Sequence, residues 1–296
     1  MEDGAAVLRM DEPRILVAST TANADSISRR IAFSRRVGSF VPDGAFSSEH
    51  LDLIRRGSYR VRVFALDSRP HTEDVISEVA ARVGGRVSLE KPDVEVTVVR
   101  GKKDYIAITR PQEMTQDWAQ RRPRRRPFFH PAAIFPKLSR ALVNLTRVRR
   151  GETIIDPFCG TGSLLLEAYE AGATPVGLDI DGRMVRGARS NMASFGQSWL
   201  GLIKADAGRA PLRTVDAICT DVPYGRASST SGSNTRTIID DLVVTSSHLL
   251  PAEHRLVLMH PKSVTVTSGD GLLLEEQHHL YIHRNLTRTI SVLRRD

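Results

Sequence analysis

The stretch "TIIDPFCGTGSLLLEA" (153–168) runs from a short apolar strand through two glycines directly into a helix. Gly160 and Gly162 permit a tight turn and let backbone N–H groups approach a ligand closely. Position 165, where a dinucleotide-binding fingerprint has its third glycine, is Leu165, and the Gly-Lys-Ser/Thr of a phosphate-binding loop is absent. The stretch predicts a strand–turn–helix unit of an α/β fold, and a turn without any ligand is the alternative.

From residue 128 onward the chain alternates between helices and strands, as in a parallel α/β sheet. Apolar periodicity predicts helices over 183–195 and 236–250 and a short strand over 199–203. The last two strand-like segments, "LEEQHHLYIH" and "LTRTISVLRR", are close enough in sequence to pair antiparallel. We expect a doubly wound, Rossmann-like α/β sheet that ends in an antiparallel hairpin and binds ligands at the carboxyl ends of its strands.

Aspartates follow the first three strands of this sheet. Asp156 precedes the glycines, where a carboxylate would repel a pyrophosphate but suits a cationic amino-acid group. Asp179 stands where doubly wound folds place an acid for ribose hydroxyls, and Asp181 is the alternative, expected as a helix cap. Asp206 is placed to accept a hydrogen bond from an adenine amino group. Each alone would be a cap or turn residue, but together they favour S-adenosylmethionine over NAD or ATP as the cofactor.

The fourth strand leads into "ICTDVPYGRASS" (218–229), one letter away from the Asp-Pro-Pro-Tyr of methyltransferases that alkylate a nucleobase amino group. Such an amine is a poor nucleophile because its lone pair is delocalised into the base. The carboxylate of Asp221 and the backbone carbonyl of Val222 offer two acceptors for its N–H bonds. Pro223 fixes the loop, and Tyr224 offers a face on which a flipped base stacks. Any residue supplies a carbonyl, so Val222 is compatible with activity; a plain Asp-x-Pro turn is the alternative.

Composition limits the class of protein only broadly. The 296 residues are 41% hydrophobic and 26% charged, which is typical of one large or two modest globular domains. No apolar run approaches the ~18 residues of a membrane span, and the N-terminus lacks an apolar signal segment. Cys159 and Cys219 are too few for a disulfide framework or a cysteine zinc cluster, and the histidines show no ligand spacing. We expect a cytoplasmic protein without a membrane or metal partner and favour a monomer.

The net charge of +8 favours contact with a polyanion, and the basic residues cluster in "RRPRRR" (121–126). Such a run either binds phosphates or forms a solvated linker, and the sequence leaves both open. We predict RNA contacts for the arginines of this run and for two lysines of an upstream turn: Arg121, Arg122, Arg124, Arg125, Arg126, Lys102 and Lys103.

Residues 1–110 predict a small α+β module. The segment 59–66 alternates as a half-buried strand does, and 73–85 places an apolar face on a helix that ends at two glycines. Periodicity alone assigns no function to this module. Residues 111–127 have proline at both ends and no apolar period, so we expect a basic linker there and a second domain over 128–296.

The assembled sequence resembles the archaeal tRNA guanine-N2 methyltransferases that modify position 10. The segments "RRPFFHPAAIFPKLSRALVNLTRV" (125–148), "DPFCGTGSLLLEA" (156–168) and "HRNLTRTISVLRR" (283–295) are similar to the family's pre-loop segment, cofactor loop and closing hairpin. The resemblance covers nearly the whole chain, strongly from residue 125 and weakly before residue 110. It implies a class I methyltransferase domain that uses S-adenosylmethionine, preceded by a THUMP domain that helps to hold tRNA.

The resemblance also implies roles for individual residues. Asp156, Gly160 and Gly162 match the methionine-binding loop, while Asp179 and Asp206 match the ribose and adenine contacts. Asp221, Pro223 and Tyr224 match the catalytic tetrad, from which Val222 departs. His130 matches a segment that touches the cofactor's carboxylate, and capping of the next helix is the alternative. Three neighbours complete the predicted cofactor contacts: Phe158, Ile180 and Ala207.

Three functions follow from these observations. The main prediction is transfer of one or two methyl groups from S-adenosylmethionine to guanine N2 in tRNA, at position 10. A first alternative is an amino-methyltransferase of ribosomal RNA or DNA, although a DNA enzyme would be expected to have a target-recognition domain in place of the THUMP-like half. A second alternative is a tRNA-binding protein whose catalytic activity is weak or absent because of Val222.

Overall fold

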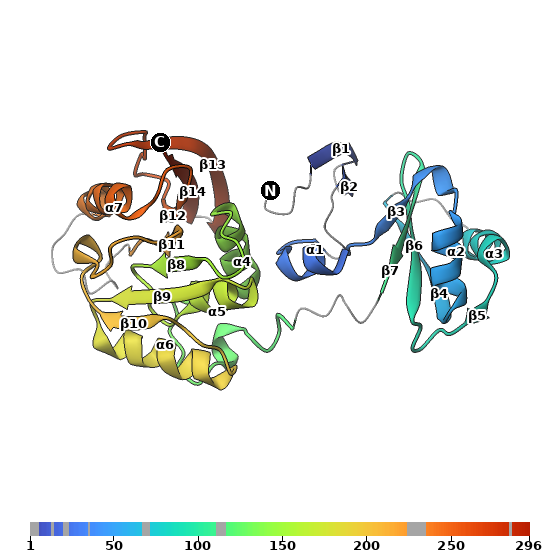
Figure 1. The fold of residues 1–296 in the computed structure, drawn as a ribbon, viewed down its shortest axis with the longest axis horizontal. Coiled ribbons are helices and arrows are strands. Elements are labelled where there is room, and N and C mark those ends of the chain that lie inside the picture. The colour runs from blue at the N-terminus through green and yellow to red at the C-terminus, as the bar shows by residue number, and fades with distance from the viewer. Residues whose placement is uncertain are drawn as a thin grey trace. The chain divides into compact units, whose positions relative to one another are not determined.

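The computed structural model describes residues 6–12, 15–19, 24–34, 36–66, 72–110, 117–223, 235–283 and 286–296. The chain forms two compact units: Asp3–Arg29 with Ser34–Gln116, and Arg30–Phe33 with Asp117–Asp296. Figure 1 labels the helices and strands of both units, each of which is described by itself. The elements of the first are β1 (Ala6–Glu12), β2 (Ile15–Ser19), α1 (Ala24–Arg30), β3 (Ser39–Val41), α2 (Ser48–Arg55), β4 (Ser58–Ala65), α3 (Thr72–Val83), β5 (Arg86–Val87), β6 (Val94–Arg100) and β7 (Asp104–Thr109).

The first unit is built on a five-stranded sheet with the strand order β3-β7-β6-β4-β5. Strand β4 runs parallel to β6, and β6 pairs antiparallel with β7. The alternation predicted for 59–66 is confirmed, because Tyr59, Val61 and Val63 pack into one hydrophobic cluster with the buried valines of β6. Helix α3 closes this cluster with Val79 and Val83, the apolar face that the sequence predicts for it.

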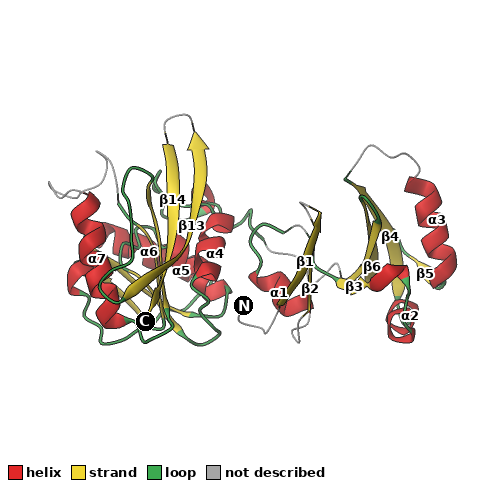
Figure 2. Cartoon of the chain, turned by 90° about the horizontal axis from the view of Figure 1, so that it is seen from above, coloured by secondary structure: helices red, strands yellow, loops and turns green. Residues whose placement is uncertain are grey.

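The second unit is built on a seven-stranded sheet with the order β10-β9-β8-β11-β12-β14-β13. The first five strands in this order are parallel, whereas β14 pairs antiparallel with β12 and with β13. Figure 2 shows the hairpin of β13 and β14. This is the predicted doubly wound sheet with an antiparallel C-terminal hairpin. Its elements are α4 (Pro136–Leu145), β8 (Thr153–Asp156), α5 (Ser163–Glu170), β9 (Thr174–Asp179), α6 (Gly182–Ser194), β10 (Gly201–Lys204), β11 (Ala217–Asp221), α7 (Thr235–Leu249), β12 (Arg255–Pro261), β13 (Leu272–His283) and β14 (Leu286–Arg295).

The boundaries of α6, β10 and α7 lie within two residues of the predicted ones. The strands are apolar on both faces because helices cover both faces. Ile154 of β8 packs with α4 and α5, while its neighbour Ile155 packs on the opposite face with α7. This two-sided burial fixes the parallel register, so the carboxyl ends of β8, β9, β10 and β11 lie along one edge of the sheet.

Residues 117–127 differ from the predicted basic linker, because they belong to the second unit and partly line its interior. Glu167 of α5 is fully buried, and its carboxylate binds Arg121 (Nε–Oε1 2.7 Å) and Arg140 of α4 (Nη2–Oε2 2.9 Å). The ring of Trp118 lies against both guanidinium groups. The segment shows no apolar period because charged side chains make its buried contacts. Residues 111–116 lie outside the described residues.

Candidate active site

The glycine turn after β8 has the backbone geometry that the sequence predicts. Gly160 and Gly162 adopt φ angles of +49° and +79°, in the left-handed region that favours glycine. A Cβ atom on Gly162 would lie 3.2 Å from the Cβ of Ala188 on α6, so a side chain would also crowd the neighbouring helix. The turn brings α5 directly onto the end of β8, and the N–H of Gly160 points to a carboxylate on the next strand.

That carboxylate belongs to Asp179, the last residue of β9. Its Oδ2 accepts the N–H of Gly160 at 2.9 Å and its Oδ1 accepts the N–H of Asp181 at 2.8 Å. Burial raises the pKa of Asp179 above its usual value. Asp181 caps α6 by accepting the N–H of Arg183 at 2.8 Å, so the capping alternative is confirmed for Asp181.

Asp156 ends β8, and Asp206 follows the end of β10 by two residues, and the two lie in different environments. Asp156 is buried, and its Oδ1 accepts the Thr220 hydroxyl at 2.6 Å and the N–H of Phe158 at 3.1 Å. Burial raises the pKa of Asp156 to about 7. Asp206 is exposed and accepts the N–H of Gly208 at 2.9 Å.

Asp221 ends β11 and forms an ion pair with Arg288 of β14. Burial raises the pKa of Asp221 to about 6, and the attraction of Arg288 opposes this rise. Val222 is fully buried, and its N–H donates to the Met259 carbonyl of β12 at 3.0 Å, which continues the sheet pairing by one bond. Pro223 follows, while Tyr224 lies outside the described residues, so its predicted role stays a prediction.

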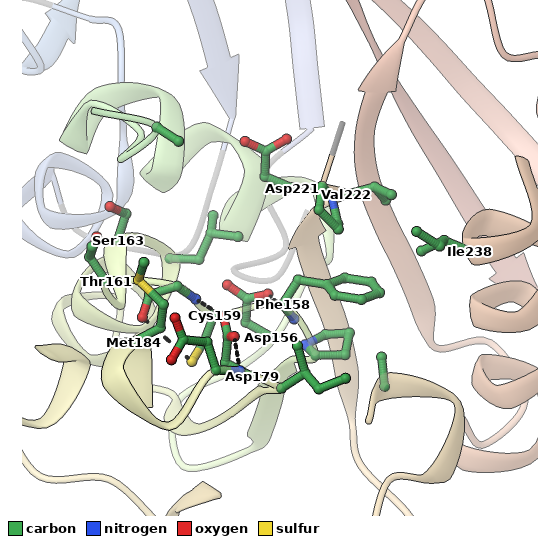
Figure 3. Close-up of a pocket in the computed structure, with 18 of the residues that line it drawn as sticks. Asp156, Phe158, Cys159, Thr161, Ser163, Asp179, Met184, Asp221, Val222 and Ile238 are labelled. Carbon is green, nitrogen blue, oxygen red and sulfur yellow. Dashed lines mark hydrogen bonds between the residues drawn. The ribbon is translucent and has the colours of Figure 1, made fainter. Parts of the chain in front are cut away.

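One pocket of ≈ 650 Å³ is lined by residues at the ends of these strands. In Figure 3, Thr161 and Ser163 lie on one side, Val222 and Ile238 lie on the opposite side, and Asp156 lies between them. The predicted residues that line the pocket are His130, Asp156, Phe158, Gly160, Asp179, Ile180, Asp206, Ala207, Asp221, Val222 and Pro223. Gly162 forms the turn and is not a lining residue, and its N–H donates to the Cys159 carbonyl at 2.8 Å.

Known methyltransferases are similar to this chain in sequence and in fold. A family model described as "RMKL-like, methyltransferase domain" matches residues 123–272. A tRNA (guanine(10)-N2)-dimethyltransferase of Methanothermobacter thermautotrophicus is 33% identical over 91% of this chain and 84% of its own length. A tRNA (guanine(10)-N2)-dimethyltransferase of Methanocaldococcus jannaschii is 31% identical over 83% of this chain and 73% of its own length. The chain belongs to this methyltransferase family.

The crystal structure of TrmN from Thermus thermophilus shows the same fold, with a TM-score of 0.50 and 24% sequence identity over 81% of this chain and 72% of that one. The class I methyltransferase fold is therefore established for the chain. Among the described residues, no group of three or more His, Cys, Asp or Glu is arranged to hold a metal ion. Within the same residues, no helix is long and apolar enough to cross a membrane.

The arginine run divides into two groups in this methyltransferase unit. Arg122, Arg124 and Arg125 are exposed, and they stay predicted RNA contacts. Arg121 and Arg126 are buried, which corrects their prediction as phosphate ligands. Arg121 binds Glu167, while Arg126 donates to the Ser163 hydroxyl at 2.6 Å and to the Arg121 carbonyl at 2.9 Å, so both guanidinium groups are withdrawn from the surface.

The two predicted lysine contacts lie in the first unit. Lys102 and Lys103 are exposed in the turn between β6 and β7, and the Lys103 ammonium lies 5.1 Å from the centre of the Tyr105 ring. In the second unit, His130 lines the pocket, and its Nδ1 accepts the N–H of Ala132 at 3.3 Å. His130 therefore forms part of the pocket wall and makes a hydrogen bond within the turn that follows it. The capping alternative is wrong, because α4 begins at Pro136 with Phe135 as its N-cap.

The reasoning from sequence did not identify several residues that line the pocket or contact its carboxylates. Arg288 reaches Asp221 only through the pairing of β14 with β12, so its distance in sequence gives no signal. Thr161 and Ser163 stand inside the quoted glycine stretch, where their hydroxyl groups are the available signal. Asp241 of α7 lies one turn from Ile238 on the pocket-facing side of the helix, and this helical spacing is the signal for it.

Proposed function

We propose that this protein transfers the methyl group of S-adenosylmethionine to the exocyclic N2 of a guanine in tRNA. The observation that carries the proposal is the meeting of Asp156, Asp179, Asp206 and Asp221 at one pocket, in a chain whose relatives are named tRNA (guanine(10)-N2)-dimethyltransferases. We propose position 10 of tRNA as the target, because the names of these relatives specify it.

The polar groups of the pocket fit the two ends of an amino-acid zwitterion. The Oγ1 of Thr161, which lines the pocket, is buried without a hydrogen-bond partner among the described residues. Ser163 accepts a hydrogen bond from Arg126, so its hydroxyl proton can be donated into the pocket that it lines. These donors fit a carboxylate, while Asp156 nearby fits an ammonium group.

The remaining cofactor contacts follow the strand order. Asp179 would hold the ribose hydroxyls, and Asp206 would accept from the adenine amino group, with Phe158, Ile180 and Ala207 as the apolar walls. When bound, S-adenosylmethionine supplies an electrophilic methyl group on its sulfonium. Such a group needs a water-poor pocket and a nucleophile held in line with it.

The residues after β11 would supply the guanine side of the reaction. The carboxylate of Asp221 and the carbonyl of Val222 accept the two N–H bonds of the amino group, which concentrates the nitrogen lone pair toward the methyl group. The nitrogen–methyl bond would form as the bond between the methyl carbon and the sulfonium sulfur breaks, which leaves a neutral thioether. The nitrogen would lose one proton to this carboxylate or to water. Tyr224 would stack on the flipped base.

Binding of tRNA would involve both units. Arg122, Arg124 and Arg125 are exposed, and the Arg124 guanidinium lies 5.9 Å from the centre of the ring of exposed Phe129. The first unit, with Lys102 and Lys103, would act as a THUMP-like RNA-binding domain. We further propose that the protein acts as a monomer in the cytoplasm, where its substrate is found.

Cofactor binding tests the proposal without requiring turnover. Calorimetric titration of the wild type with S-adenosylmethionine should saturate at one site. Asp179→Ala should weaken binding about 10–100-fold, because a hydrogen bond to a charged group contributes about 1.5–3 kcal/mol. The matched control is Asp240→Ala, which removes an exposed carboxylate of α7 that pairs with Arg236 and does not line the pocket, and it should leave the affinity nearly unchanged. Absent wild-type binding, or equal losses in both variants, would reject the assigned site.

Single-turnover assays separate the remaining functions. Methyl transfer to unmodified tRNA, with little transfer to ribosomal RNA or DNA, supports the proposal. Tight tRNA binding without any methyl transfer would instead support an inactive tRNA-binding protein.

A further inference from the structure

Asp221 is held in the pocket by an arginine from another part of the sheet. The Arg288 Nη2 donates to Oδ1 of Asp221, and its Nη1 lies 3.5 Å from Oδ2, so the guanidinium spans both carboxylate oxygens. Arg288 is 4% exposed and belongs to β14, which is separated from β11 by β12. Such a two-point contact fixes the plane of a carboxylate as well as its position.

The carbonyl of Met259 on β12 links this pair to the predicted catalytic loop. It accepts the N–H of Val222 at 3.0 Å and lies 3.5 Å from the Nη2 of Arg288. Proline at position 222 would lack this N–H and would restrict the backbone through its ring. In this chain, the hydrogen bond of the Val222 N–H to β12 restrains the loop where a proline ring would otherwise do so.

We propose that Arg288 is a positioning residue for methyl transfer, which orients the Asp221 carboxylate and keeps it negatively charged while leaving lone pairs for the guanine amino group. A carboxylate has about four lone-pair sites, and a two-point arginine occupies about two of them. The side chain of Asp221 is 19% exposed and lines the pocket, so its remaining sites are accessible. This inference rests on the proposed function.

The charge around Asp221 explains why a cation is needed. Burial favours the protonated carboxyl, in which one oxygen carries a proton and the remaining acceptor is weaker than that of a carboxylate. The other titratable groups around the pair carry no permanent positive charge: Asp156 of β8, Cys219 of β11, His260 of β12, His279 of β13 and Asp241 of α7. Burial lowers the pKa of His260, and the positive charge of Arg288 lowers it further, so this histidine does not substitute for the arginine.

The test is the pH profile of the single-turnover methyl-transfer rate, with saturating S-adenosylmethionine and tRNA, between pH 5 and 9. Arg288 opposes the raised pKa of Asp221, so Arg288→Gln should move the acidic limb to higher pH by about one unit or more. The rate at pH 7 should fall about 10–100-fold and recover in part at pH 9. Arg288→Lys should keep the limb near its wild-type position.

The matched control is Arg294→Gln, which removes an arginine of the same strand that pairs with Glu275 at 2.9 Å. It should leave the acidic limb in place. Combination with Asp221→Asn completes a double-mutant cycle, in which Arg288→Gln should cause little further loss of rate. The inference would be overturned if Arg288→Gln lowered the rate equally at every pH. It would also be overturned if the fold-losses of Arg288→Gln and Asp221→Asn multiplied in the double variant.

Thermal unfolding of each variant identifies a loss of folding. If Arg288→Gln does not fold, the double-mutant cycle is made with Arg288→Lys in its place, alone and combined with Asp221→Asn. An equal loss of methyl-transfer rate from Arg288→Lys with and without Asp221→Asn would then overturn the inference. A wild type without methyl transfer contradicts the proposed function itself. An active wild type whose acidic limb is unmoved in Arg288→Gln contradicts only the role of Arg288.

Discussion

Two carboxylates of the second unit, Glu167 and Asp221, are each bound by arginine, and they differ in what remains accessible. Glu167 is fully buried between Arg121 and Arg140, which contact both of its oxygens. Asp221 has Arg288 on one side and the pocket on the other. A carboxylate that is surrounded by arginine stabilises the packing of α4, α5 and the 117–127 segment. A carboxylate that is held from one side can also serve a substrate.

The largest difference between variants of Asp221 and Glu167 is expected in the rate of methyl transfer. Asp221→Asn should lower the single-turnover rate about 10²–10⁴-fold, in the range of a lost acid–base or acceptor group. Its effect on stability should be smaller than that of a change at Glu167, because water reaches the pocket and Arg288 also lies beside the Met259 carbonyl. Quench-flow assays and thermal unfolding of the same preparation measure both effects.

Glu167→Gln should show the opposite pattern. Loss of the shared carboxylate leaves two buried guanidinium groups without their counter-ion, which costs about 3–5 kcal/mol of unfolding free energy. The rate per folded molecule should change only a few-fold, because Glu167 does not line the pocket. Denaturant unfolding measures the first effect. A rate loss like that of Asp221→Asn, without a loss of stability, would remove the distinction between the two carboxylates.

Asp156 gives a pH-dependent test within the pocket. Its pKa of about 7 lies above the usual value of 3.8, so the folded state binds more protons than the unfolded state between these values. Stability from this group is therefore present at low pH and is lost as pH rises through 7.

Asp156→Asn should thus raise the unfolding free energy at pH 8, by up to about 4 kcal/mol at ~1.4 kcal/mol per pKa unit. The gain should shrink toward pH 4, and cofactor affinity should fall. Thermal unfolding across this pH range makes the measurement, with Asp206→Asn as the control for an exposed strand-end carboxylate. A gain of equal size at both pH values would contradict the assigned cost of burying Asp156.

The smallest effect is expected for a substitution of Val222, the residue that departs from the Asp-Pro-Pro-Tyr tetrad. Val222→Pro removes the N–H that donates to the Met259 carbonyl, which costs about 0.5–1.5 kcal/mol. The methyl-transfer rate should stay within about 10-fold of the wild type and should not rise, whereas Val222→Ile retains the N–H as a control. A faster Val222→Pro enzyme would show that valine impairs the loop.

The sequence predicts those parts of the fold that depend on local pattern. The glycine turn, the strand-end aspartates and the closing hairpin follow from spacing, because each is encoded within a few adjacent residues. The burial of Arg121 and Arg126 could not be predicted in this way, because a charged residue becomes internal only when a distant partner such as Glu167 neutralises it. Arg288 is likewise positioned by the pairing of β14 with β12, which no local period encodes.

The central claim is tested most directly by mass spectrometry of nucleosides. Unmodified tRNA is incubated with the purified protein and isotopically methyl-labelled S-adenosylmethionine and is then digested. The account predicts labelled N2-methylguanosine or N2,N2-dimethylguanosine from the wild type and almost none from Asp221→Asn. Label on another atom or base, or equal label from both proteins, would contradict it.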